Sequence, residues 1–242
     1  MKKIYTHPKS LRNISTHYCP GCGHGIAHRL IAEVVDELGI RGKVIGVAPI
    51  GCAVVAYDYW DFDCSEAAHG RALAVATAIK RVRPQNIVFT YQGDGDLAAI
   101  GTNETIHAAN RGENVTVIFI NNAVYGMTGG QMAPTTLLSQ KTATTPFGRN
   151  AAIEGYPLKI SEMLAQLPAV KYIERVSLSS PQEIIKAKQA IRQAFKNQID
   201  STGFSLVEIL SPCPTYWGLS AQDALVWIKD VMAKEFPLGR IK

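Results

Sequence analysis

Residues 86–126 decide the fold of this chain, and they read NIVFTYQGDGDLAAIGTNETIHAANRGENVTVIFINNAVYG. Two apolar runs, Asn86–Tyr91 and Val115–Ile120, have the length and β-branched content of buried strands. Between them, Leu97–Arg111 has the composition of a helix and closes on Gly112, a residue type suited to ending one. The stretch therefore predicts a β-α-β unit.

A polar cluster follows each predicted strand: Gly93-Asp94-Gly95-Asp96 after the first and Asn121-Asn122 after the second. Because a right-handed crossover brings both strand ends to one edge of a parallel sheet, we expect Asp94 and Asn122 to face one point in space. A carboxylate, an amide oxygen and flanking glycines suit a hard cation such as Mg²⁺ that carries a phosphorylated cofactor. Each cluster alone is also typical of turns, so the interpretation depends on the pair and its spacing.

Strands and helices alternate along the rest of the chain. The expected helices are His24–Leu38, Glu66–Arg83 with Ser65 as N-cap, Ser161–Leu167, Pro181–Asn197 and Gln222–Lys234, and the further expected strands are Lys43–Ala48, Val170–Val176 and Phe204–Leu210. Gly126–Pro157 lacks periodicity and is predicted to be a long functional loop. The pattern predicts one domain over residues 1–242, an α/β fold with a doubly wound, mostly parallel sheet and helices on both faces. Since ligands bind outside the carboxyl ends of such strands, Pro49–Cys52 and Ser211–Pro214 are expected at the same edge as the two polar clusters.

The composition is that of an ordinary soluble protein of 242 residues, with 47% hydrophobic residues, 19% charged residues and a net charge of +5. No Lys/Arg run stands out, so no nucleic-acid partner is expected. No apolar stretch approaches the roughly 18 residues of a membrane span, and no apolar core follows Met1-Lys2-Lys3 as it would in a signal peptide. We therefore expect a cytoplasmic protein without a membrane partner, whose five cysteines are not paired in disulfides.

Four of the cysteines can meet at one site. Cys19-Pro20-Gly21-Cys22 is a Cys-x-x-Cys turn, and Cys52 and Cys213 follow predicted strands, where they could complete a four-thiolate site. Spacing does not separate tetrahedral Zn²⁺ from a [4Fe–4S] cluster, because both accept four thiolates. Cys64 lies outside this set and is predicted to be a small buried hydrophobe.

The order of the motifs resembles that of a known family. The motifs are Cys-Pro-Gly-Cys-Gly-His from Cys19, Ile-Gly-Cys from Ile50, His69-Gly70-Arg71, Gly-Asp-Gly-Asp from Gly93, Asn-x-Val-Tyr-Gly from Asn122, Thr-x-Gly-Gln from Thr128 and Pro-Cys-Pro-Thr-Tyr from Pro212. Over nearly its whole length the chain resembles the β subunit of 2-oxoacid:ferredoxin oxidoreductases, and the spacing of Asp94 and Asn122 is similar to the thiamine diphosphate signature. The fold implied is the thiamine diphosphate-binding fold of the diphosphate-domain type.

The resemblance implies thiamine diphosphate, Mg²⁺ and one [4Fe–4S] cluster as cofactors. Carried over position by position, it makes Asp94, Asn122 and the carbonyl of Val124 the magnesium ligands, and Cys19, Cys22, Cys52 and Cys213 the cluster ligands. The implied cofactor-binding residues are Ile50, Gly51, Cys52, His69, Gly93, Asp94, Gly95, Asp96, Asn122, Val124, Tyr125 and Gly126.

Three histidines are also candidates. His69 is the candidate catalytic residue, expected to open a helix and to contact either the diphosphate or the reacting carbonyl, although a lone histidine is more often structural. His24 and His28 form an i, i+4 pair without the Glu of a zinc-protease helix, so they are interpreted as helix surface or as support behind the site.

The reaction that the resemblance implies is thiamine-dependent oxidative decarboxylation of a 2-oxoacid to acyl-CoA and CO₂. Its electrons must leave one at a time, which an iron–sulfur cluster permits and redox-inert Zn²⁺ does not, so the cofactor signature favours the cluster. The motifs look most like those of subunits acting on branched-chain 2-oxoacids or 2-oxoglutarate. Gly129, where some members carry Lys, favours a branched-chain acid.

The expected partners are an α subunit that supplies the activating glutamate, a ferredoxin-like subunit or ferredoxin, and coenzyme A. Two other classes of function stay open. One is a non-oxidative thiamine diphosphate decarboxylase or synthase subunit, and the other is a Zn²⁺-binding interaction module without catalysis.

Overall fold

The computed structural model describes residues 6–242, and its centre is a seven-stranded sheet in the order β2-β1-β3-β4-β6-β5-β7. All neighbouring pairs are parallel except β5 and β7, which are antiparallel. The strands are β1 (Val44–Ala48), β2 (Asp63–Glu66), β3 (Ile87–Gly93), β4 (Thr116–Asn121), β5 (Val170–Ser177), β6 (Phe204–Leu210) and β7 (Gly239–Arg240). The prediction of a mostly parallel α/β sheet is confirmed.

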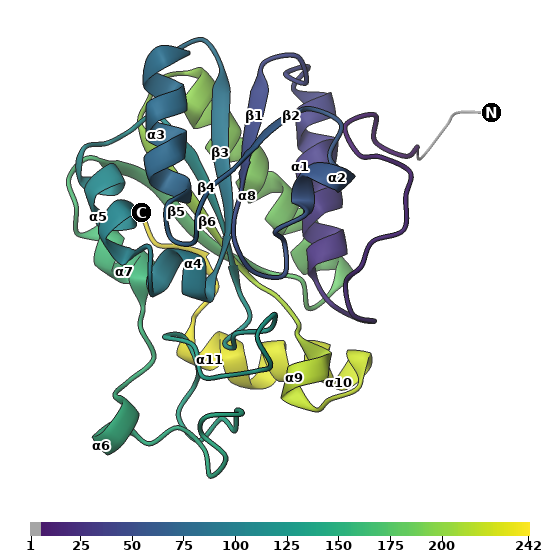
Figure 1. Ribbon diagram of the computed structural model, residues 1–242, viewed down its shortest axis with the longest axis vertical. Helices are drawn as coiled ribbons and strands as arrows, with labels where there is room; N and C mark the ends of the chain where they lie inside the picture. Colours follow the sequence, from purple (N-terminus) through teal and green to yellow (C-terminus); the bar gives the residue numbers. More distant parts are fainter. Residues whose placement is uncertain (1–5) are drawn as a thin grey trace.

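Helices cover both faces of the sheet (Figure 1). They are α1 (His24–Glu37), α2 (Ala56–Tyr59), α3 (Ala72–Val82), α4 (Asp94–Ala98), α5 (Thr102–Asn110), α6 (Ala151–Glu154), α7 (Ile160–Ala165), α8 (Pro181–Ile199), α9 (Pro214–Trp217), α10 (Ala221–Trp227), the π-helical segment η1 (Ile228–Met232) and α11 (Ala233–Glu235). None of the described helices is long and apolar enough to cross a membrane.

Two hydrophobic cores explain why the strands form where they do. On one face, α1 and α8 pack on the sheet around side chains such as Phe89 and Phe195. On the other face, α3, α5 and α7 pack around Val117 and Phe119. Every residue of β4 and β6 is buried, as expected for central strands covered on both sides.

The predicted helix Glu66–Arg83 is wrong in its first part. Asp63–Glu66 form the edge strand β2, paired with β1, so Ser65 lies in a strand and is no N-cap. Gly70 then turns the chain with φ +77°, packed closely against the backbone of Ile100. The helix α3 begins at Ala72, and His69 lies in the preceding loop instead of opening a helix.

One other predicted helix is interrupted. Leu97–Arg111 is covered by α4 and α5, which are separated at residues 99–101, where Ala99 leaves the helical conformation with φ −116° and ψ −91°. The predicted helix Gln222–Lys234 is helical throughout, because α10, η1 and α11 follow one another without a gap; only the hydrogen-bond pattern changes, to π-helical, at Ile228–Met232. Asp94 is the first residue of the short helix α4, directly after the end of β3.

The long segment 126–157 lies beyond the carboxyl ends of the strands, on the same side as α9, α10 and α11 (Figure 1). It is irregular apart from α6, as predicted. Buried Arg149 holds its backbone, donating hydrogen bonds to the carbonyls of Pro134, Thr136, Glu154, Gly155 and Tyr156.

Candidate active site

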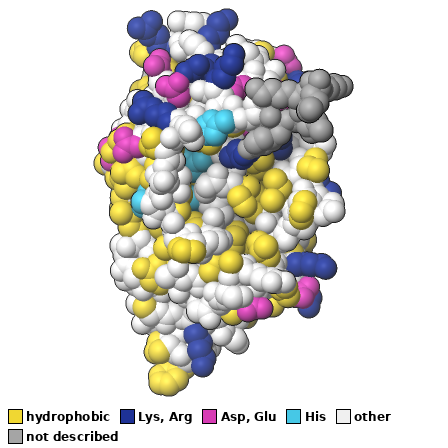
Figure 2. Space-filling model, turned by 90° about the vertical axis from the view of Figure 1, so that its right-hand side faces the viewer, with side chains coloured by type: hydrophobic (Ala, Val, Ile, Leu, Met, Phe, Trp, Pro, Cys, Tyr) yellow, Lys and Arg dark blue, Asp and Glu magenta, His cyan; other side chains and the backbone are white. Residues whose placement is uncertain are grey.

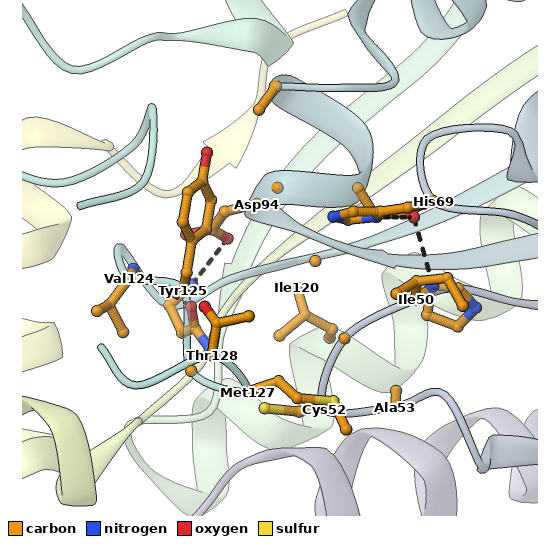
Figure 3. Close-up of a pocket in the computed structure, with 18 of the residues that line it drawn as sticks. Ile50, Cys52, Ala53, His69, Asp94, Ile120, Val124, Tyr125, Met127 and Thr128 are labelled. Atoms are coloured by element: carbon orange, nitrogen blue, oxygen red, sulfur yellow. Dashed lines mark hydrogen bonds and ion pairs between the residues drawn. The ribbon is translucent and has the colours of Figure 1, made fainter. Parts of the chain in front are cut away.

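One pocket of about 250 Å³ lies at the carboxyl ends of β1, β3 and β4 (Figure 3). Six stretches of chain supply its walls: the start of α1, the segment after β1, the loop before α3, the junction of β3 with α4, the link between α4 and α5, and the end of β4 with the segment after it. All the residues expected to bind the cofactor line it: Ile50, Gly51, Cys52, His69, Gly93, Asp94, Gly95, Asp96, Asn122, Val124, Tyr125 and Gly126.

Asp94 is a buried carboxylate with no countercharge among the described residues. Its Oδ1 accepts the backbone N–H of Asn122 at 3.2 Å, and its Oδ2 accepts the hydroxyl of Thr135 at 2.6 Å. Burial raises the pKa of Asp94 to about 7, against the lowering effect of these hydrogen bonds. A divalent cation would supply the missing positive charge, so the donor set here fits Mg²⁺.

The turn after β4 presents Asn122 and Val124 beside Asp94. The Oδ1 atom of Asn122 accepts the N–H of Val124 at 3.4 Å. Ala123, between them, has φ +57°, a left-handed conformation that is uncommon for a residue with a Cβ. Three side chains clamp this turn: Thr136 and Gln140 donate to the carbonyl of Ala123, and Trp217 donates to the carbonyl of Asn122.

The carboxylate of Asp96 is occupied by protein groups. Its Oδ2 accepts Gln92 Nε2 at 2.6 Å, and its Oδ1 accepts the N–H of Gly70 at 2.9 Å and that of Ile50 at 3.4 Å. The same Oδ1 lies 2.8 Å from Nδ1 of His69. Asp96 therefore holds the loops at Ile50 and His69 around the pocket, and among the described contacts it leaves Nε2 of His69 free to face a ligand (Figure 3).

A second, smaller pocket adjoins the first, and Cys19, Cys22, Cys52 and Cys213 all line it. Cys52, His24, Asn122 and Gly126 belong to both pockets. A Cβ on Gly126 would lie 3.0 Å from the sulfur of Cys52, closer than ordinary contact, and 3.8 Å from that of Cys213, so a side chain there would press on Cys52. Cys19 is exposed and Cys213 is buried, so the pocket reaches from the surface inward.

The thiols of Cys52 and Cys213 lie in an environment that disfavours free thiolates. Burial, reinforced by the neighbouring thiols, raises the pKa of Cys52 to about 11 and that of Cys213 to about 12. A bound metal would reverse this by stabilising the thiolates. Among the described residues, no three His, Cys, Asp or Glu side chains are arranged to hold one metal ion. The fifth cysteine, Cys64, is half-buried against the core, as predicted.

The structure also brings in residues that sequence reasoning missed or misjudged. His24 and His28 were expected at the helix surface or as support behind the site; both are buried, which excludes the helix surface, and burial lowers the pKa of both. His24 Nδ1 lies 2.7 Å from the hydroxyl of Tyr91, and His28 Nε2 lies 2.8 Å from that of Tyr18. Their position directly after the Cys-x-x-Cys turn was the available signal. Thr135 carried no signal beyond its place in a Thr-rich segment.

Comparisons with known proteins agree with this geometry. Residues 50–209 match the family described as thiamine pyrophosphate enzyme, C-terminal TPP binding domain. The whole chain is 51% identical to the ketoisovalerate oxidoreductase subunit VorA of Methanothermobacter thermautotrophicus, but spans only 53% of it. With the 2-oxoglutarate synthase subunit KorB of Archaeoglobus fulgidus it is 38% identical, over 95% of this chain and 82% of the relative. The chain thus spans about half the length of the first of these relatives and most of the second.

Two solved structures are similar. One is the 2-oxoglutarate:ferredoxin oxidoreductase from Magnetococcus marinus with 2-oxoglutarate, coenzyme A and succinyl-CoA bound, with a TM-score of 0.76 and 30% identity, over 89% of this chain and 70% of that one. The other is the thiamine diphosphate-dependent 4-hydroxybenzoylformate decarboxylase of Rhodococcus jostii RHA1, with a TM-score of 0.52 and 15% identity, over 83% of this chain and 35% of that one. This second likeness concerns the fold alone.

Proposed function

This chain belongs to the family of thiamine diphosphate-binding subunits of 2-oxoacid:ferredoxin oxidoreductases, and we propose that it carries out the decarboxylating half of that reaction within a hetero-oligomer. In this proposal a 2-oxoacid is oxidatively decarboxylated to acyl-CoA and CO₂, and electrons leave through a [4Fe–4S] cluster to ferredoxin. Residues 1–242 act as one cofactor-binding domain to which the N-terminal Cys-x-x-Cys segment adds cluster ligands.

The observation that carries the proposal is that the two pockets adjoin and share residues. One is lined by the thiamine-signature residues and the other by four cysteines, and Cys52, Asn122 and Gly126 belong to both. A carbon centre and a one-electron acceptor must lie close together if electrons are to leave singly. A thiamine enzyme without electron transfer needs no such neighbour.

In the first pocket, Asp94, Asn122 and the carbonyl of Val124 would hold Mg²⁺ and through it the diphosphate. Thiamine diphosphate, when bound, supplies the electron sink that decarboxylation needs. Gly93 has open space where a Cβ would be, so the backbone there can approach a ligand closely. His69, oriented by Asp96, would place Nε2 at the diphosphate or at the reacting carbonyl.

In the second pocket, Cys19, Cys22, Cys52 and Cys213 would ligate the cluster. Each thiolate of a [4Fe–4S] cluster binds a different iron, so the sulfurs stand farther apart than around one tetrahedral ion with Zn–S bonds of about 2.3 Å. Thiols that line one cavity without closing on a single ion suit the cluster better.

The substrate is proposed to be a 2-oxoacid with an apolar side chain, of the branched-chain type. None of the described lining residues is Lys or Arg, so a distal substrate carboxylate would find no cationic partner from this chain. The apolar lining includes Ile50, Ala53, Ala99, Ile100, Ile120 and Met127. The 51% identity to a ketoisovalerate oxidoreductase subunit points the same way.

A partner subunit is proposed to complete the site. No glutamate lines the described part of the pocket, and Glu104 and Glu208 are engaged elsewhere with Arg71 and Arg175. An α subunit would therefore supply the glutamate that activates the thiamine ring, and a ferredoxin-like subunit or ferredoxin would collect the electrons. Apolar side chains gather across the middle of one face of the molecule (Figure 2), which is compatible with a partner lying there.

The test is an anaerobic cofactor and turnover assay. We expect thiamine diphosphate and magnesium to bind in equal amounts, together with about four irons per chain. We expect CO₂ release and ferredoxin reduction only when the partner subunits are present. Turnover by this chain alone at the rate of the complex would place the activating glutamate on this chain and contradict the proposal.

The same assay separates the two alternatives. A non-oxidative thiamine enzyme would bind thiamine diphosphate but contain no iron. A zinc-binding interaction module would contain zinc, no iron and no thiamine diphosphate.

A further inference from the structure

A buried ion cluster lies behind the active-site pocket, and no step proposed so far uses it. Arg175 on β5 and Glu208 on β6 are each 1% exposed, and Arg175 Nε donates to Glu208 Oε2 at 2.8 Å. The two Nη atoms of Arg175 donate to both carboxylate oxygens of Glu162 at 2.8 and 2.7 Å. Neither Arg175 nor Glu208 lines the pocket.

Such a cluster is a poor way to stabilise a fold. Removing two charges from water carries a large desolvation cost, and well-packed apolar side chains often stabilise a core as well or better. A buried ion pair can instead fix the geometry of its neighbours. The other hydrogen bonds of this cluster therefore indicate which neighbouring residues it could position.

Glu208 reaches the metal-binding turn through Asn121. The Nδ2 atom of Asn121 donates to Glu208 Oε1 at 2.7 Å, and this pairing orients the amide because an ionised carboxylate only accepts. With Nδ2 directed at Glu208, Oδ1 of Asn121 faces the other way and accepts the N–H of Ala123 at 3.2 Å. Ala123 is the residue with φ +57°.

The conformation of Ala123 determines what the turn presents. A left-handed residue between Asn122 and Val124 reverses the chain locally, so that both of its neighbours lie beside Asp94. The strain of this conformation persists only where the surrounding structure enforces it. The hydrogen bond from Ala123 to Asn121 is one such restraint, and Glu208 accepts from the other end of the same Asn121 amide.

We propose that Glu208, held by Arg175, is a positioning residue that sets the Asn121 amide and through it the left-handed turn carrying the magnesium ligands Asn122 and Val124. The inference rests on the proposed function, because it concerns the magnesium site of that function. Glu208 touches neither metal nor substrate and acts through Asn121.

The first test is Glu208→Gln, a change that keeps the size of the side chain. Gln offers one acceptor oxygen where the carboxylate offers two, so it cannot serve both Arg175 and Asn121. The Mg²⁺ concentration needed for half-maximal thiamine diphosphate binding, measured by calorimetry on the intact chain, should rise about tenfold or more, as for other partners of metal ligands.

The second test exchanges the two partners. Asn121→Asp alone sets two carboxylates against each other and should weaken Mg²⁺-dependent binding as well. In the double variant Asn121→Asp/Glu208→Gln, the Gln amide donates to the Asp while its oxygen accepts from Arg175. This restores a matched donor–acceptor pair, with the direction of the hydrogen bond reversed, and keeps the total charge, so the double variant should recover most of the lost Mg²⁺ affinity.

Gln198→Leu is the matched control for a general loss of stability. Gln198 is a buried amide that bonds the backbone of Val88 and the hydroxyl of Thr116, toward the amino ends of β3 and β4. Its replacement should lower the unfolding temperature and leave the Mg²⁺ dependence unchanged. In the metal-free protein, amide NMR signals of residues 121–124 should shift in Glu208→Gln and return in the double variant.

The outcomes are distinct. Unchanged Mg²⁺ dependence in Glu208→Gln, or a loss that the control shares and the double variant does not repair, overturns the inference and leaves the proposed function intact. Wild-type protein that binds no thiamine diphosphate in the presence of Mg²⁺ overturns the proposed function and the inference with it.

Discussion

The backbone N–H of Asn122 donates a 3.2 Å hydrogen bond to Oδ1 of Asp94, although the two residues are 28 positions apart. The contact exists because β3 and β4 are adjacent parallel strands whose carboxyl ends lie at the same level in the sheet, with Gly93 in register with Ile120. The helices between them cover one face and return the chain to the same edge. A carboxylate and an amide thereby meet at one end of the sheet, which is the arrangement that a metal-bound diphosphate needs.

Asp94→Ala is expected to abolish Mg²⁺-dependent binding of thiamine diphosphate, because it removes the one charged ligand of the proposed metal site. Calorimetric titration of the cofactor in the presence of Mg²⁺ measures this. Asp200→Ala, at an exposed helix end, is the control and should bind normally. Normal binding by Asp94→Ala would show that the diphosphate is held elsewhere.

Without metal, the Asp94 carboxyl is expected to make the free energy of unfolding depend on pH. Its carboxyl has a pKa of about 7 in the folded protein, above its ordinary value of 3.8, so the folded state holds the proton longer than the unfolded state does. The contribution of this group to the free energy of unfolding therefore falls as the pH rises from about 4 to about 7, by at most roughly 4 kcal/mol.

Asp94→Asn should remove that slope. The difference between wild type and Asp94→Asn in urea unfolding without metal, measured from pH 4 to 8, isolates it from the opposite effect of the buried histidines. Those have lowered pKa values, so the stability they contribute is lost as the pH falls below about 6.5. A pH-independent difference would contradict the prediction.

Cys52→Ala is expected to lower the iron content and to impair ferredoxin reduction more than decarboxylation, because Cys52 lines both pockets. Iron analysis of anaerobically purified protein, with CO₂ release and ferredoxin reduction measured in the assembled complex, gives the three quantities. Cys64→Ala should leave all three unchanged, since Cys64 packs against the core away from the other cysteines. A full cluster in Cys52→Ala would remove it from the ligand set.

His69→Gln is expected to lower kcat of the complex by about 100-fold or more, the range of a positioned proton donor or acceptor. Its affinity for thiamine diphosphate should change much less. Among the contacts of residues 6–242, the side chain is held through Nδ1, by Asp96, which leaves the other nitrogen for the reacting carbonyl. The opposite pattern, with affinity lost and kcat kept, would assign His69 to the diphosphate instead.

Met127→Lys is expected to shift substrate preference toward 2-oxoglutarate over 2-oxoisovalerate by about tenfold. A cation in this otherwise uncharged part of the lining would pair with the distal carboxylate of a diacid, and a charged hydrogen bond contributes about 1.5 kcal/mol or more. Ratios of kcat/KM for the two acids measure it. Wild-type preference for the diacid would overturn the branched-chain proposal before the variant is needed.

The sequence by itself determined the parallel sheet, the edge at which ligands bind, and the three strand ends that contribute Ile50, Asp94 and Asn122 to the pocket. Those inferences depend on local features: apolar runs of strand length, glycine and proline at chain reversals, and polar residues directly after strands. Parallel topology then converts each strand end into a position on one edge. This is why Ile50, Asp94 and Asn122 could be assigned to one site although they are distant in the chain.

Other features were decided only by the tertiary structure. Asp63–Glu66 became a strand because β1 offered an unpaired edge, and His24 and His28 became buried because Tyr18, Trp60 and Tyr91 pack over them. The hydrogen bonds that lead from Arg175 through Glu208 to Asn121 join side chains of three neighbouring strands, β5, β6 and β4. No local pattern encodes such contacts, because hydrogen bonds and packing between distant segments depend on which strands become neighbours and in what register.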